Sequence, residues 1–95
     1  MKDFSMKVEE ILFGPMPSLG EGELILAGPH VSGSCHVGDN LVVESSGGQP
    51  VPALCVGLEL VDWGADRSDW LSVRVKPASS IQGEHMEEIF LKSQR

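Results

Sequence analysis

Residues 27–44 read AGPHVSGSCHVGDNLVVE, and this stretch decides how the rest of the chain is interpreted. Three glycines recur in it at five-residue spacing, at positions 28, 33 and 38. A glycine lets the backbone take a positive φ or pass close to a neighbouring strand, so a short segment can leave one strand, turn and enter the next. We therefore assign Gly28, Gly33, Gly38 and Asp39 to structural turns between two strands.

Strand-like patterns continue on both sides of this stretch. We expect strands at Glu23 to Ala27, Leu41 to Glu44, Val51 to Val61 and Trp70 to Lys76. The apolar residues of Met6 to Phe13 change phase across two glutamates, so this segment fits either a helix turn or a strand with a β-bulge. Val51 to Val61 is the longest candidate, and turn-forming residues separate the expected strands.

The alternation assigns side chains to faces in two of these strands. In the longest one, Leu54, Val56, Leu58 and Leu60 lie on one face, and Ala53, Cys55, Gly57 and Glu59 on the other. In the last one, Leu71, Val73 and Val75 point inward, and Trp70, Ser72, Arg74 and Lys76 point outward.

From Pro77 the pattern changes. A flexible connection follows, and Glu84 to Lys92 places Met86, Ile89 and Phe90 at i, i+3 and i+4. Acidic residues come early in this segment and a lysine late, which suits a helix dipole. We expect a short C-terminal helix here.

The glycine-rich stretch resembles the second domain of translational GTPases such as elongation factor Tu. The resemblance rests on the pattern small-Gly-x-x-x-x-Gly-x-x-x-Val-Gly-Asp-x-Leu-x-Val, which ends at Val43, and on Val8 to Phe13, which is similar to the first strand of that barrel. It favours the strand interpretation of Met6 to Phe13. The resemblance implies an all-β fold, a small closed β-barrel, which we place over residues 1–78. The linker and short helix over 79–95 have no counterpart in that family.

Composition restricts the partners. The 95 residues include fourteen acidic and seven basic side chains, for a formal net charge of −7. Such a charge repels phosphate backbones and anionic lipid surfaces, so we expect neither nucleic acid nor membrane as a partner. The first ten residues carry charges where a signal peptide needs an apolar core, which predicts a cytoplasmic protein. Cys35 and Cys55 are accordingly expected to be reduced thiols.

The search for catalytic chemistry is mostly negative. The chain has no Gly-x-x-x-x-Gly-Lys-Ser/Thr phosphate loop, so GTP hydrolysis by that route is excluded. His30, Cys35, His36 and Asp39 are close in sequence and invite a metal or nucleophile hypothesis. Neighbouring strand residues point to opposite faces, however, which separates Cys35 from His36. We predict no enzyme activity, no cofactor and no metal.

A protein-binding surface is the remaining prediction. Asp62, Trp63, Asp66, Asp69 and Trp70 combine acidic and aromatic side chains in one connection between strands. Tryptophan is a frequent anchor in protein interfaces, and carboxylates attract a basic partner. We therefore expect a non-catalytic interaction module, of which an inhibitor or immunity-type protein is the more specific form. The alternatives are a translation-associated accessory factor and a small-molecule or metal site around His30, Cys35 and His36.

Overall fold

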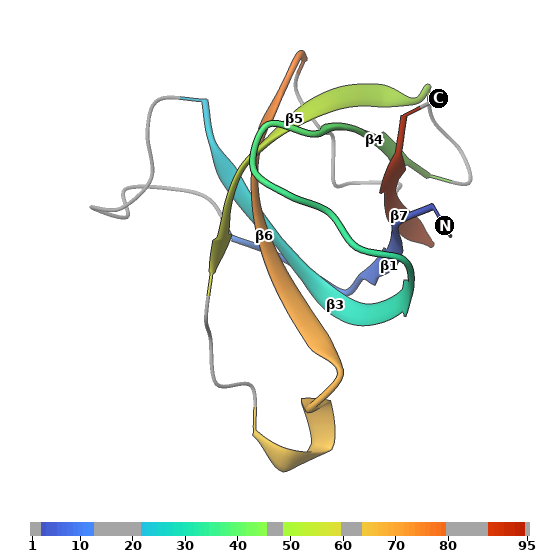
Figure 1. The fold of residues 1–95 in the computed structure, drawn as a ribbon, viewed down its shortest axis with the longest axis vertical. Helices are drawn as coiled ribbons and strands as arrows, with labels where there is room; N and C mark the ends of the chain where they lie inside the picture. Colours follow the sequence, from blue (N-terminus) through green and yellow to red (C-terminus); the bar gives the residue numbers. More distant parts are fainter. Residues whose placement is uncertain (1–2, 13–21, 46–48, 60–63, 80–87, 95) are drawn as a thin grey trace.

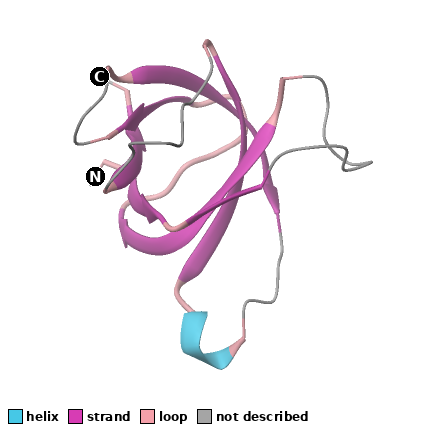
Figure 2. Ribbon diagram, turned by 180° about the vertical axis from the view of Figure 1, so that it is seen from behind, coloured by secondary structure: helices cyan, strands magenta, loops and turns pink. Residues whose placement is uncertain are grey.

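The computed structural model describes residues 3–12, 22–45, 49–59, 64–79 and 88–94. Figure 1 shows that they form a small barrel, and Figure 2 shows the same arrangement from behind. Its elements are β1 (Ser5–Val8), β2 (Glu10–Leu12), β3 (Leu24–Ser32), β4 (Asn40–Glu44), β5 (Val51–Glu59), the 3₁₀ turn η1 (Ala65–Arg67), β6 (Trp70–Pro77) and β7 (Ile89–Ser93). The all-β prediction is therefore confirmed.

The sheet closes on itself. The strand order is β1-β7-β4-β5-β6-β3-β2, and an additional pairing joins β1 to β3. β1 and β2 both pair with β3, and only Glu9 separates them, so they occupy one position in the barrel. The result is a closed six-stranded antiparallel barrel. The strand interpretation of Met6 to Phe13 is confirmed over β1 and β2, while Phe13 lies outside the described residues.

Gly28 shows how the barrel closes. It lies within β3, opposite Leu71, and not at a turn, because β3 extends from Leu24 to Ser32 and so beyond the expected end at Ala27. A Cβ atom at this position would lie 1.8 Å from the carbonyl oxygen of Lys7. Glycine is therefore needed at position 28 because another strand passes close to it, and not because the chain turns there.

The barrel interior is filled by aliphatic side chains with few aromatic ones. Because β-strand residues alternate between two faces, each strand contributes every second side chain to this core. The largest fully buried side chains are Phe4, Met6, Leu26, Leu41, Val43, Cys55, Val73, Val75 and Leu91.

The expected C-terminal helix is wrong where it can be checked. Ile89–Ser93 is strand β7, which pairs with β1 on one side and β4 on the other. Ile89 and Leu91 are buried and Phe90 is half-buried, so the strand period governs this segment. Two rows of main-chain hydrogen bonds outweigh a three-residue helical pattern. The sheet therefore includes residues on both sides of the boundary expected at 78, and residues 80–87 lie outside the described part.

The expected faces of β5 also need correction. The register between β5 and β6 shifts between Cys55 and Gly57, so Val56 is an extra residue. Before the shift, Leu54 lies opposite the exposed Lys76; after it, Leu58 lies opposite the buried Val73. The bulge thus puts the two leucines on opposite faces of the sheet, which simple alternation does not predict.

In β6 the prediction holds in part. Val73 and Val75 are buried as expected, but Leu71 is 36% exposed and Ser72 is buried. Leu71 lies opposite Gly28 near the end of the strand, where the barrel opens. Its exposure is a property of that open end.

Candidate functional site

The predicted interaction surface is partly assembled by the structure. Asp66 lies in η1, Asp69 follows it, and Trp70 begins β6, so these three residues belong to the turn between β5 and β6, which Figure 1 shows projecting from the barrel. Both aspartates are exposed and Trp70 is half-buried. Asp62 and Trp63 lie outside the described residues. The residues of the prediction that can be placed are therefore neighbours along the chain where β6 begins, and their joint role in binding stays a prediction.

This turn is fastened to the barrel. The guanidinium of Arg67 lies over the Trp70 ring, 4.4 Å from its centroid. The main-chain N–H of His30 donates a hydrogen bond of 3.0 Å to the carbonyl oxygen of Asp69. A guanidinium on an indole face contributes roughly 0.5–1 kcal/mol at an exposed site. Trp70 and Asp69 are thus held at fixed positions relative to β3.

A cleft of about 440 Å³ lies beside Trp70. Its position follows from the strand lengths, because β4 pairs with β5 only from Val51 to Leu54 while β5 continues to Glu59. Its walls include Phe4, His30, Cys35, Leu58, Trp70 and Leu71.

Two leucines of this cleft are exposed although they lie on the inner face of the sheet. Leu58 pairs with the buried Val73, and Leu71 pairs with Gly28, yet they are 52% and 36% exposed. Beyond Leu54 no residue of β4 pairs with β5, so β4 does not cover them. The cleft could not be predicted from the sequence, because the bulge at Val56 determines which leucine faces inward.

His30 and Cys35 both line the cleft, but His36 is not part of its lining. His30 Nε2 lies 2.6 Å from the carbonyl oxygen of Gly33, and its ring stacks on Phe4 at 6.2 Å between centroids. His36 lies beside Asp39, whose carboxylate accepts a 2.8 Å hydrogen bond from the His36 main-chain N–H. Among the described residues, no three His, Cys, Asp or Glu side chains are grouped as metal ligands would be.

The turns that carry these residues use glycine for its backbone freedom. Gly33 has a φ of 64° and Gly38 a φ of 97°. Gly38 and Asp39 also bond to β5, because the Gly38 N–H donates to the Cys55 carbonyl oxygen and the Cys55 N–H donates to the Asp39 carbonyl oxygen. The connection between β3 and β4 is thereby attached to β5.

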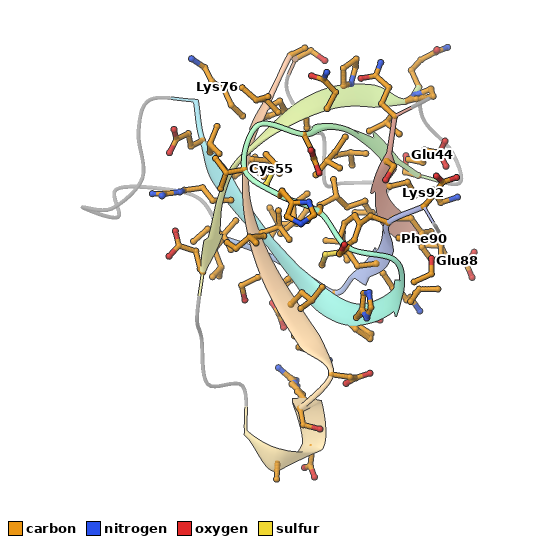
Figure 3. The ribbon with its side chains drawn as sticks, viewed as in Figure 1. Glu44, Cys55, Lys76, Glu88, Phe90 and Lys92 are labelled. Carbon is orange, nitrogen blue, oxygen red and sulfur yellow. The ribbon has the colours of Figure 1, made fainter. Side chains whose placement is uncertain are left out.

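Cys35 and Cys55 are free and buried side by side. Cys55 belongs to the barrel interior (Figure 3), and its Sγ lies 3.8 Å from the carbonyl oxygen of Gly57. Burial raises the pKa of the Cys35 thiol to about 12, with smaller contributions from Cys55 and Asp39. Burial raises the pKa of Cys55 as well. Both groups are therefore neutral at pH 7 and poor nucleophiles.

Comparison with protein-family models, with curated proteins and with solved structures gives no match to this chain. The described residues contain no helix with the length and apolar character needed to cross a bilayer. The closed barrel is established by the structure, and the resemblance of the stretch ending at Val43 to the translation-factor barrel stays a prediction.

Proposed function

We propose that this protein is a non-catalytic module that binds another protein through the open end of the barrel. The observation that carries the proposal is the exposure of Leu58 and Leu71 in a cleft that Trp70 also lines, with the exposed Asp66 and Asp69 in the turn that leads into Trp70. Apolar side chains that a fold leaves uncovered, with a charged rim, are typical of interaction sites. The catalytic alternative has little support, since the pKa of Cys35 is raised to about 12 and the thiol stays protonated.

A basic partner suits this surface best. The chain has a formal net charge of −7, and both aspartates of the turn are exposed. Long-range attraction of opposite charges accelerates association and is screened over about 10 Å at 0.1 M salt. An inhibitor or immunity-type role against a basic protein is the more specific form of the proposal.

The barrel type supports a second, translation-associated candidate. The closed six-stranded barrel and the glycine pattern ending at Val43 are both expected of a translation-factor second domain. In that case the protein acts as an accessory factor next to the translation machinery. Salt-sensitive binding to ribosomes would favour this candidate over an inhibitor role.

The cleft itself supports a third candidate, a small-molecule site. Its volume of about 440 Å³ falls in the range of roughly 300–1,000 Å³ found for ligand pockets. A small ligand would contact Leu58 and Leu71 without involving Asp66 or Asp69. Binding that depends on the charges of Asp66 and Asp69 therefore favours a protein partner, and binding that does not depend on them favours a small molecule.

The test uses charge reversal with a matched control. The double variant Asp66→Lys/Asp69→Lys reverses the charge of the turn that leads into Trp70. The control variant Glu10→Lys/Glu88→Lys makes the same change in net charge at two other exposed residues, one in β2 and one directly before β7. Proteins captured from the source cells by each variant are identified, and the affinity of each purified partner is measured at low and high salt.

The expected result is that a partner is lost with Asp66→Lys/Asp69→Lys, is retained with the control, and binds more weakly as salt rises. Equal capture by both variants would refute an interface at Asp66 and Asp69.

A further inference from the structure

The free edge of β5 suggests how a partner binds. At Ala53 and Leu54, β5 has β4 on one side and β6 on the other. Cys55 is bonded to Gly38 and Asp39 instead of to β4. Among the described residues, Gly57 to Glu59 pair with β6 alone. Within the described part of the chain, one side of Gly57 to Glu59 is therefore an unpaired strand edge, which is a template for another strand.

The backbone groups on that edge belong to Leu58. The N–H and C=O of Cys55 bond to Asp39 and Gly38, away from β6. In an antiparallel pair both residues point their main-chain groups either toward each other or away, so Val75, opposite Cys55, directs its N–H and C=O toward β3. Val73, two residues before Val75 and in the same regular register with β3, has the same orientation. Its partner Leu58 consequently directs its N–H and C=O away from β6, toward the cleft side.

The surroundings of this edge specify the side chains that fit. The exposed Leu58 and Leu71 offer apolar contact, and Trp70 lines the same cleft. Asp66 and Asp69 are exposed in the turn that leads into Trp70, whereas the carboxylate of Glu59, which does line the cleft, is already 3.2 Å from Arg74 Nε. An incoming strand presents alternate side chains to two faces, so one set meets the leucines and the other is free to carry charge.

We infer that the cleft receives an extended segment of the partner, which adds as a strand to β5 at Leu58. Apolar side chains of that segment enter the cleft, and the lysine or arginine residues between them approach Asp66 and Asp69. This mode rests on the proposed protein-binding function. A second copy of this chain fits less well, because its net charge of −7 is repelled by the same two carboxylates.

The probe is a capped peptide of about six alternating valine and lysine residues, the ordinary length of a strand. Two matched peptides carry N-methyl groups either on every valine or on every lysine. An added strand bonds to the edge through alternate residues only, so one methylated peptide should bind about tenfold more weakly and the other nearly as well as the parent. A peptide held only by its charges and apolar side chains, without main-chain hydrogen bonds, would bind equally well in both methylated forms.

Hydrogen exchange and a matched pair of leucine variants complete the test. Peptide binding should slow exchange of the Leu58 amide by at least about tenfold, whereas the Leu54 amide, which lies between two paired strands, should be unaffected. Leu58→Ser should weaken the peptide, and Leu54→Ser, which changes another exposed leucine of β5, should not.

The outcomes separate this inference from the proposed function. If both methylated peptides bind like the parent, or if no peptide binds, strand addition is overturned. The protein-binding surface still stands in that case if Asp66→Lys/Asp69→Lys loses the captured partner. A dimer in sedimentation that Leu58→Ser dissociates would show that a second copy takes the edge, which also overturns the inference.

Discussion

Replacing Gly28 with alanine should open the seam between β1 and β3. A Cβ atom there would lie 1.8 Å from the Lys7 carbonyl oxygen, 2.9 Å from the Lys7 carbonyl carbon and 3.0 Å from the Glu9 nitrogen. All three are main-chain atoms, so no side-chain rotation relieves the clash. The strands must separate by about 1.5 Å to restore ordinary contact.

The size of the effect follows from what this separation disrupts. Forcing an additional methyl group into a packed site costs about 1–3 kcal/mol. The seam also holds the 2.8 Å hydrogen bond from the Glu9 N–H to the Ala27 carbonyl oxygen, and a lost hydrogen bond costs about 0.5–1.5 kcal/mol. We expect Gly28→Ala to lower the free energy of unfolding by about 3 kcal/mol, a large share of the roughly 5–15 kcal/mol typical of a folded domain.

Urea unfolding of Gly28→Ala and of a control variant, Gly57→Ala, measures the loss in free energy of unfolding for each substitution. A Cβ at Gly57 would also be crowded, with the nearest atom, Arg74 Nη2, at 2.8 Å, but that atom ends a flexible side chain that can move aside. Gly57→Ala should therefore cost less than about 1 kcal/mol. If Gly28→Ala is no more destabilising than this control, the close approach of β1 to β3 is wrong.

Three other predictions concern the site and the thiols. Trp70→Ala should leave the thermal transition in place and weaken partner binding by at least ~2 kcal/mol in calorimetry; loss of the transition would show that Trp70 is structural. Denatured protein without reductant should yield two titratable thiols with Ellman's reagent, and finding none would show a Cys35–Cys55 disulfide. Folding raises the pKa of the Cys35 thiol from 9.0 to about 12, so the thiol of the unfolded chain loses its proton at a lower pH than that of the folded chain. The free energy of unfolding should therefore fall as pH rises from 9 toward 12. Cys35→Ser should flatten that decline in urea titrations.

Most strands and two of the turns could be predicted from the sequence because strand alternation and glycine spacing are local signals. Val73 and Val75 are buried as their alternation predicts, and Gly33 and Gly38 take the positive φ values expected of turns. The strand at Ile89–Ser93 was missed because its apolar residues also fit one helix turn, and only pairing with β1 and β4 decides between the two.

The candidate site was less predictable. The turn with Asp66 and Trp70 could be found from residue types, but the cleft beside it could not. The shape of the cleft depends on the extra residue Val56, which turns Leu58 to the inner face. It also depends on the pairing of β4 with β5, which extends along β5 only as far as Leu54. Both are properties of strand pairing, and alternation within one strand contains no information on the register with its neighbour.

The position of β7 between β1 and β4 has a consequence for the folding rate. Phe4 and Ser93 exchange two hydrogen bonds, from the Phe4 N–H to Ser93 Oγ at 2.9 Å and from the Ser93 N–H to the Phe4 carbonyl oxygen at 3.0 Å. Phe4 and Ser93 are 89 residues apart in the sequence. Contacts between residues so distant in sequence give a high contact order, for which folding in milliseconds to seconds is usual. During synthesis, β1 and β4 must wait for β7 to leave the ribosome, with their edges on that side exposed to neighbouring chains meanwhile.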